Sequence, residues 1–281
     1  MKAMKDYLVK VETGLSETKI VLIGGGYISQ KLSLILHNRG LSCLIIPDLK
    51  ELDFSSSPEF IFLFNEGSES LPEIFLNFFE TIKTKLIIIS IDRPSGENLA
   101  RQCLSKDIDF CFASIYDLYC GGKSGSALEK VFSEIKNEKI ITFKNDQVIV
   151  TPIFIDDAIE GLCRIAFSTQ TFKKRFFLTG REEVPLVVFA DRTSVEAAGV
   201  YGVRLNLLDS ELTYPEVVRH EKILNRDESY SLLNWMPEVG MSDGIKLVLN
   251  LLKPVKMVPK NKPLTLTAES PKVKKKTTLN Q

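Results

Sequence analysis

The sequence predicts an α/β fold in which a doubly wound parallel sheet carries helices on both faces. Apolar runs of strand length alternate with segments of helical periodicity, and a glycine-rich turn joins the first such strand to the first helix. The composition agrees, because 281 residues with 44% hydrophobic and 26% charged side chains can bury a full core.

The first half of the chain supplies the sheet. Five apolar, β-rich runs are predicted as strands: Lys19–Gly24, Ser42–Pro47, Glu59–Phe64, Lys85–Ile91 and Asp109–Ser114. Four segments with apolar residues at i, i+3 and i+4 are predicted as helices: Ser29–Asn38, Leu71–Lys83, Ser95–Ser105 and Ser124–Lys136. Regular alternation of strands and helices favours a parallel sheet with right-handed crossovers.

After Lys139 the order becomes irregular, which predicts a smaller, interleaved carboxy-terminal lobe. The expected strands are Ile140–Phe143, Gln147–Ile149 and Arg175–Thr179, and the expected helices are Asp156–Ser168 and one that begins near Pro185. Residues 253–281 hold eight lysines, four prolines and one glutamate, although the whole chain has zero net charge. Such a tail cannot bury enough apolar surface to order itself. We expect a disordered basic tail, either simply solvated or in contact with an acidic partner, nucleic acid or lipid.

The cysteine pattern and the hydropathy exclude several classes of protein. Five scattered cysteines, none spaced CxxC, argue against a disulfide framework or a zinc site, so no metal is expected. No apolar run approaches the ~20 residues that span a bilayer, and the amino terminus has no signal-peptide core. We expect a cytoplasmic protein without a membrane span.

The first strand runs directly into a turn with dinucleotide-binding spacing. Gly24, Gly26 and Ser29 occupy the G-x-G-x-x-G positions, and Tyr27 and Ile28 lie between the last two. The first glycine allows a tight turn, and the second lets the backbone approach a pyrophosphate at the positive helix terminus. The alternative is a tight strand–helix turn that has lost its nucleotide.

Asp48 is the residue predicted to discriminate between NAD and NADP. It lies 24 residues after Gly24, at the end of the second strand, where an acid binds a ribose 2′-hydroxyl. This position favours NAD over NADP, while the nearby Lys50 weakens the preference. The sequence therefore predicts NAD or NADP as the cofactor.

Three further segments give the chain a family resemblance. Lys50–Phe64 (KELDFSSSPEFIFLF) is similar to the ELDITD segment and following strand of dTDP-4-dehydrorhamnose reductases, and Val150–Leu162 (VTPIFIDDAIEGL) to the segment RDFIHVDDVAxA. Ile223–Leu252 resembles the terminal motif that contains L-G-W-x-P. Together with the glycine turn, the chain resembles an extended short-chain dehydrogenase/reductase of the NAD-dependent epimerase/dehydratase family.

The resemblance implies a Rossmann-type domain with a small substrate lobe, a dinucleotide, often a nucleotide sugar, and commonly a homodimer. The corresponding division is an N-terminal extension (1–18), an NAD(P)-binding domain (19–168), a substrate-type lobe (169–252) and the tail (253–281). Family chemistry uses a serine or threonine at the end of the fifth strand, and a tyrosine and lysine four residues apart on the next helix. The lysine lowers the tyrosine pKa for proton transfer during hydride exchange.

Only the serine is found where the family pattern expects it. Ser90 ends the strand taken as the family's fifth, but no tyrosine follows before Tyr116 and no lysine before Lys106. The match Tyr27–Lys31 belongs to the glycine turn's own helix. The match Tyr119–Lys123 lies in the glycine loop YCGGK, not in a helix. Tyr119, or Tyr116 beside it, remains a weak candidate for an unrecognised acid.

Other polar residues have simpler interpretations. The family's arginine positions fall on Ser114 and Thr151, which removes cationic partners for a diphosphate. Asp156 and Asp157 begin a predicted helix, where acids stabilise the helix dipole, so capping is favoured over a paired-carboxylate site. His37 and His220 lack a triad arrangement.

Three hypotheses follow for function. The first is an NAD(P)-binding but diverged or non-catalytic protein connected with nucleotide-sugar or polysaccharide metabolism. The second is an active oxidoreductase or epimerase that uses Ser90 with a non-standard acid. The third is a nucleotide-free scaffold whose basic tail is its functional element.

Overall fold

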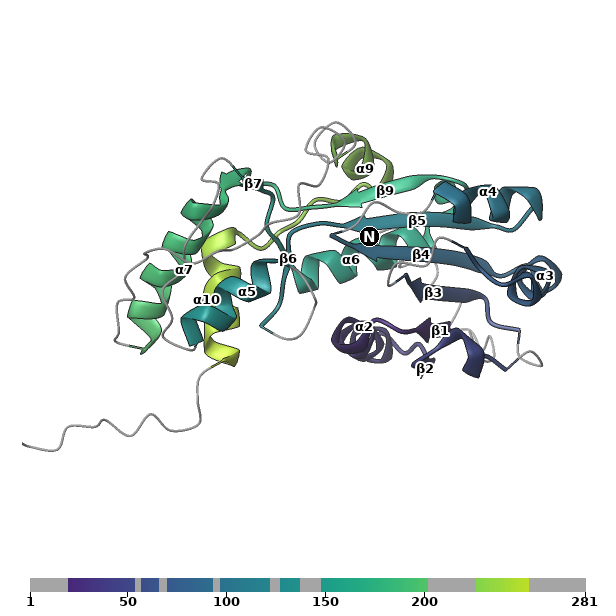
Figure 1. Cartoon of the computed structure of the whole chain (residues 1–281), viewed down its shortest axis with the longest axis horizontal. Helices are drawn as coiled ribbons and strands as arrows, with labels where there is room; N and C mark the ends of the chain where they lie inside the picture. Colours follow the sequence, from purple (N-terminus) through teal and green to yellow (C-terminus); the bar gives the residue numbers. More distant parts are fainter. Residues whose placement is uncertain are drawn as a thin grey trace, which may run out of the picture.

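The computed structural model describes residues 20–53, 57–65, 70–92, 97–121, 127–136, 148–201 and 226–252 (Figure 1). The predicted extension 1–18, the strand Ile140–Phe143 and the tail 253–281 lie outside these ranges. No helix in the described ranges is long and apolar enough to cross a bilayer.

A six-stranded parallel sheet forms the centre of the molecule, in the order β2-β1-β3-β4-β5-β9. Its strands are β1 (Ile20–Ile23), β2 (Cys43–Ile46), β3 (Phe60–Phe64), β4 (Lys85–Ile91), β5 (Phe110–Ile115) and β9 (Arg175–Leu178). The predicted α/β fold is confirmed, and the first five predicted strands agree with the structure to within one residue at either end.

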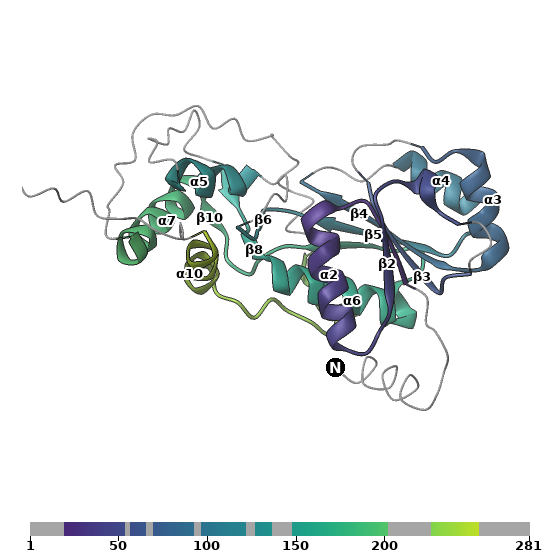
Figure 2. The ribbon, with the colours of Figure 1, turned by 90° about the horizontal axis from the view of Figure 1, so that it is seen from below.

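Alternation along the strands builds two apolar cores, one on each face of the sheet. Ile20 and Leu22 of β1 point to the face that α2 (Gly26–Asn38) and α6 (Ile155–Phe167) cover. Val21 and Ile23 point to the face of α3 (Glu73–Ile82) and α4 (Glu97–Ser105), which Figure 2 shows on the opposite side of the sheet from α2 and α6. Both faces of a parallel sheet must be apolar for this arrangement, because helices pack on each.

Beyond one end of the strands lies a second group of elements (Figure 1). It consists of three helices and two small sheets, β6–β8 and β7–β10. The helices are α5 (Ala127–Lys136), α7 (Leu186–Tyr201) and α10 (Met241–Leu251), and the strands are β6 (Leu118–Tyr119), β7 (Ile149–Val150), β8 (Ile153–Phe154) and β10 (Val184–Pro185). The strand expected at Gln147–Ile149 therefore begins two residues later.

The chain passes between the two groups of elements more than once. β9 and α9 (Arg226–Leu233), assigned by sequence to the substrate lobe, lie on the main sheet, where β9 pairs with β5. Conversely, α5 and β6 precede residue 168 but belong to the second group. Strand pairing, and not chain order, decides which residues share a sheet, and the predicted boundary at residue 168 stays a prediction.

Candidate functional site

The glycine turn leaves β1 through three successive left-handed residues. Gly24, Gly25 and Gly26 have φ angles of +75°, +75° and +47°, a region that L side chains rarely enter. The Gly24 amide donates to the Ile46 carbonyl at 2.9 Å, which ties the turn to the end of β2. β2 and β3 flank β1 on opposite sides, so the turn lies at the sheet's topological switch point, where ligands of this architecture bind.

Gly25, which the spacing pattern treated as a free position, is the most closely packed of the three. A Cβ atom there would lie 2.5 Å from the ring of Phe64 and from the Ser29 hydroxyl. That hydroxyl donates to the Gly24 carbonyl, so Ser29 stabilises the turn in place of a third glycine. The sequence signal for the lack of space at Gly25 was the run of three consecutive glycines.

Gly26, in contrast, opens to solvent. A Cβ atom at Gly26 would meet nothing within 4 Å. The amides of Gly26 and Tyr27, in the first turn of α2, have no intrahelical acceptor, and that turn contains no acidic side chain. The turn therefore presents N–H groups and a positive helix terminus to an anion.

Ile28, one of the predicted cofactor-binding residues, makes its contacts within the protein. Its side chain is buried in the core beneath α2, and its N–H donates to the Gly25 carbonyl at 3.0 Å. Its role in binding a cofactor stays a prediction. Tyr27 is half-buried, with the Lys31 ammonium 6.0 Å from its ring centre, so this YxxxK match is a contact within one helix.

Asp48 lies after the end of β2, as predicted, and its side chain is exposed. One carboxylate oxygen accepts the Lys50 amide at 2.9 Å and caps the short helix η1 (Leu49–Glu51). The other oxygen remains to accept a hydrogen bond from a ligand. Asp48 can therefore cap η1 with one carboxylate oxygen and accept a hydrogen bond from a ribose hydroxyl with the other.

Ser90 lies at the carboxyl end of β4, the fourth strand in the described part of the chain. Its side chain is buried, and its Oγ lies 3.3 Å from Ser114 Oγ on β5, the residue directly opposite in the strand register. The two hydroxyls form a cross-strand pair inside the sheet.

The tyrosines considered as alternative acids are both buried. Tyr116 stacks on Phe177 with ring centres 6.2 Å apart. Tyr119 is fully buried among Phe132, Phe154 and Phe189, and burial raises the pKa of its phenol well above the usual value. Both side chains therefore pack inside the protein, and a catalytic role for either residue stays a prediction.

A polar cluster at the carboxyl ends of β4 and β5 was not predicted from the sequence. The buried carboxylate of Asp117 accepts the Thr151 amide at 2.7 Å and the Thr151 hydroxyl at 2.9 Å. The Asp117 amide donates to Asp92 Oδ1 at 2.7 Å. Asp117 and Asp92 both have positive φ angles, which aspartate tolerates better than most residues. This cluster fixes the loops that follow the two strands. The sequence comparison with the family indicated Thr151 only as a position where an arginine is replaced.

Asp156 and Asp157 both lie in the first turn of α6, as predicted, and Asp157 has a second role. The buried carboxylate of Asp157 accepts the amides of Glu238 at 2.9 Å and Val239 at 3.0 Å. The N-cap residue of α6, Phe154, makes no side-chain capping hydrogen bond. Burial raises the pKa of Asp157. Asp157 therefore ties α6 to the segment before α10, while Asp156 is exposed.

Within the described ranges, no group of three His, Cys, Asp or Glu side chains is arranged to hold a metal ion. All five cysteines are free thiols.

Comparison with solved structures shows which known proteins have a similar fold. An epimerase from Methanothermobacter thermautotrophicus is 12% identical, with a TM-score of 0.62 over 88% of this chain and 94% of that one. A UDP-glucuronic acid 4-epimerase from Bacillus cereus, solved with NAD, is 14% identical, with a TM-score of 0.60 over 84% and 100%. The fold is that of the epimerase/dehydratase proteins.

A dTDP-4-dehydrorhamnose reductase from Bacillus anthracis, solved with NADP, shares this epimerase/dehydratase fold. It is 11% identical, with a TM-score of 0.57 over 85% of this chain and 99% of that one. No protein-family model and no curated protein matches the sequence. The likeness therefore concerns the arrangement of the elements.

Proposed function

We propose that the glycine turn binds NAD or NADP and that the chain is a diverged, non-catalytic protein with the epimerase/dehydratase fold, linked to nucleotide-sugar or polysaccharide metabolism. The observation that carries the proposal is the run Gly24–Gly26, left-handed throughout, tied to β2 and open to solvent at Gly26. The similar structures from the two Bacillus species, solved with NAD and NADP, support it.

The residues present fit a dinucleotide. Gly24 and Gly26 would admit the pyrophosphate to the amides at the start of α2, and Asp48 would accept from a ribose hydroxyl, with NAD favoured over NADP. A bound nicotinamide dinucleotide donates or accepts hydride. The residues of the glycine turn and Asp48 would hold and orient the dinucleotide.

Three observations support the absence of short-chain dehydrogenase catalysis. No tyrosine occurs between Ser90 and Tyr116. The Ser90 hydroxyl is buried against Ser114, and Tyr116 and Tyr119 are buried in apolar surroundings. A general acid must reach the proton that it transfers, and these groups face protein.

Calorimetric titration with NAD(H) and NADP(H), supported by nicotinamide fluorescence, tests the proposal. We expect binding by the native chain and its loss in Gly26→Asp, where a carboxylate would face the pyrophosphate. Gly40→Asp is the matched control. Gly40 also has a positive φ, +76°, and open space around it, but it lies at the other end of α2. Absence of binding to the native chain at millimolar cofactor would instead favour the nucleotide-free scaffold.

An active oxidoreductase or epimerase remains the alternative. It predicts turnover with a panel of nucleotide sugars that is lost in Ser90→Ala. The proposed function predicts no turnover in either protein, together with unchanged cofactor binding in Ser90→Ala.

The remaining predictions are part of the proposal. Five free thiols suit a reducing compartment such as the cytoplasm. A nucleotide sugar as second ligand, a homodimer, and a contact between the basic tail and an acidic partner are each to be tested on the full chain.

A further inference from the structure

Among the described residues, no helix covers the α3/α4 face of the sheet at its β2 edge. α3 and α4 cover β3, β4 and β5 on this face. β2 and β3 are parallel to the same neighbour, β1, yet in the described part of the connection between them the only helix is the single turn η1. A connection between parallel strands normally contains a helix that covers the sheet.

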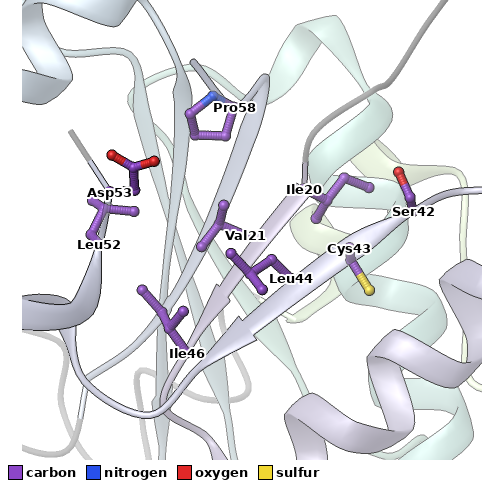
Figure 3. A pocket seen from close by; sticks show the side chains of 9 residues that line it. All are labelled: Ile20, Val21, Ser42, Cys43, Leu44, Ile46, Leu52, Asp53 and Pro58. Carbon is purple, nitrogen blue, oxygen red and sulfur yellow. The ribbon is translucent and has the colours of Figure 1, made fainter. Parts of the chain in front are cut away.

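A groove of about 300 Å³ marks the uncovered place (Figure 3). Its walls come from the starts of β1 and β2 and from the connection to β3. Leu44 of β2, at its centre, is 57% exposed, an unusual fraction for a leucine in a sheet of this kind. The lining residues are Ile20, Val21, Ser42, Cys43, Leu44, Ile46, Leu52, Asp53 and Pro58.

The sequence before β1 offers a matching apolar stripe. Met1, Met4, Leu8, Val11 and Leu15 recur at intervals of three and four residues. This spacing is that of an amphipathic helix with one apolar face. The same segment leads, through residues 16–19, into Ile20 on the wall of the groove.

We propose that residues 1–15 dock their apolar stripe in this groove and cover the face of β1 and β2 that the described part of the β2–β3 connection leaves bare. The length suffices, because 15 helical residues span about 22 Å and the four residues of β2 about 13 Å. A segment that enters β1 at its amino end would run antiparallel to the strand, as crossover helices do. The short tether to Ile20 makes docking an intramolecular event with a high effective concentration.

The test measures how accessible Leu44 is in the full chain. Leu44→Cys supplies a reporter thiol, and Cys43→Ser removes its half-buried neighbour. The other four cysteines are buried. In this reporter chain we expect maleimide labelling of the new thiol to be about tenfold slower than after Leu8→Asp/Val11→Asp, equivalent to about 1.4 kcal/mol of coverage. The matched control, Ala3→Asp/Thr13→Asp, adds the same charge off the apolar stripe and should leave the labelling rate unchanged.

Equal labelling rates in the reporter and in the Leu8→Asp/Val11→Asp chain would overturn the proposal. Protection that grows with protein concentration would also overturn it, because a second copy would then be the occupant. Should the doubly charged variant be insoluble, Leu8→Ala/Val11→Ala answers the question by the same measurement. None of these readouts requires a bound dinucleotide, so the proposal stands or falls apart from the proposed function.

Discussion

The phenol oxygen of Tyr119 lies directly against Gly244 of α10 and, although fully buried, has no hydrogen-bond partner among the described residues. Only glycine at position 244 leaves room for it, because a Cβ atom there would overlap the hydroxyl. A buried polar group without a partner lowers stability.

We therefore expect Tyr119→Phe to leave the free energy of unfolding unchanged or raise it by about 1 kcal/mol. Urea unfolding followed by circular dichroism measures the change. Tyr201→Phe is the matched control, because the Tyr201 hydroxyl also faces α10 but donates there to the Leu249 carbonyl at 2.7 Å. That control should lose about 0.5–1.5 kcal/mol. A turnover activity abolished by Tyr119→Phe alone would reinstate Tyr119 as an acid.

Asp157→Ala should lower the free energy of unfolding by about 1–3 kcal/mol, because the amides of Glu238 and Val239 lose their acceptor. The neighbouring Asp156→Ala, at an exposed position, should change it by less than about 0.5 kcal/mol. Thermal and urea unfolding of the two variants compare these values. Equal losses would show that both acids act only on the helix dipole.

Glu160 links two helices through two arginines. It accepts from Arg39 of the α2 terminus at 2.7 Å and from Arg164 of α6 at 2.8 Å. Burial alone would raise the pKa of Glu160, but the hydrogen bonds from Arg164 and Arg39 outweigh it, and the pKa lies below its usual value. The unfolded chain therefore binds this proton more tightly than the folded one.

The stability that Glu160 contributes should be fully present above about pH 4.3, the ordinary glutamate pKa, and be lost as the pH falls through the lower folded pKa. Unfolding free energies measured from pH 7 to pH 3 should decline less steeply in Glu160→Gln than in the native chain. Glu80→Gln, at an exposed position on α3, serves as the control and should retain the native slope. Parallel curves for all three proteins would contradict the prediction.

Lys85 at the start of β4 secures the end of α6. Its buried ammonium donates to the carbonyls of Ile165 at 2.8 Å, Ala166 at 2.9 Å and Ser168 at 2.7 Å, and to Thr171 Oγ1 at 2.6 Å. Burial lowers the pKa of Lys85, but these acceptors replace the water lost by the charge.

Lys85→Met should lower the free energy of unfolding by about 2–4 kcal/mol, because buried carbonyls are left without a donor. Lys130→Met, on the exposed face of α5, controls for the loss of a positive charge. Chemical unfolding and hydrogen exchange across α6 measure the effect. A loss no larger than that of the control would show that water replaces the ammonium.

Much of the fold could be predicted locally. The runs around Ile20–Ile23 and Lys85–Ile91 are apolar on both faces, which only a strand covered by helices on each side satisfies. Glycine at positions 24 and 26 indicated the turn, because left-handed backbone and close approach are properties of the residue type itself. Burial of Ser90, Tyr116 and Tyr119 could not be predicted in this way, since it depends on residues far away in the chain.

What the sequence by itself determined is the alternation of strand and helix, the parallel sheet and the place of the glycine turn, because these depend on neighbouring residues and short-range periodicity. Only the tertiary structure decided that Phe64 packs on Gly25, that Asp157 holds residues 238–239 and that β9 joins the main sheet. Each of these contacts joins residues separated by tens of positions, and local preference contains no information about such pairs. The bare groove beside β2 belongs to the same class, because it exists only where strands and connections meet.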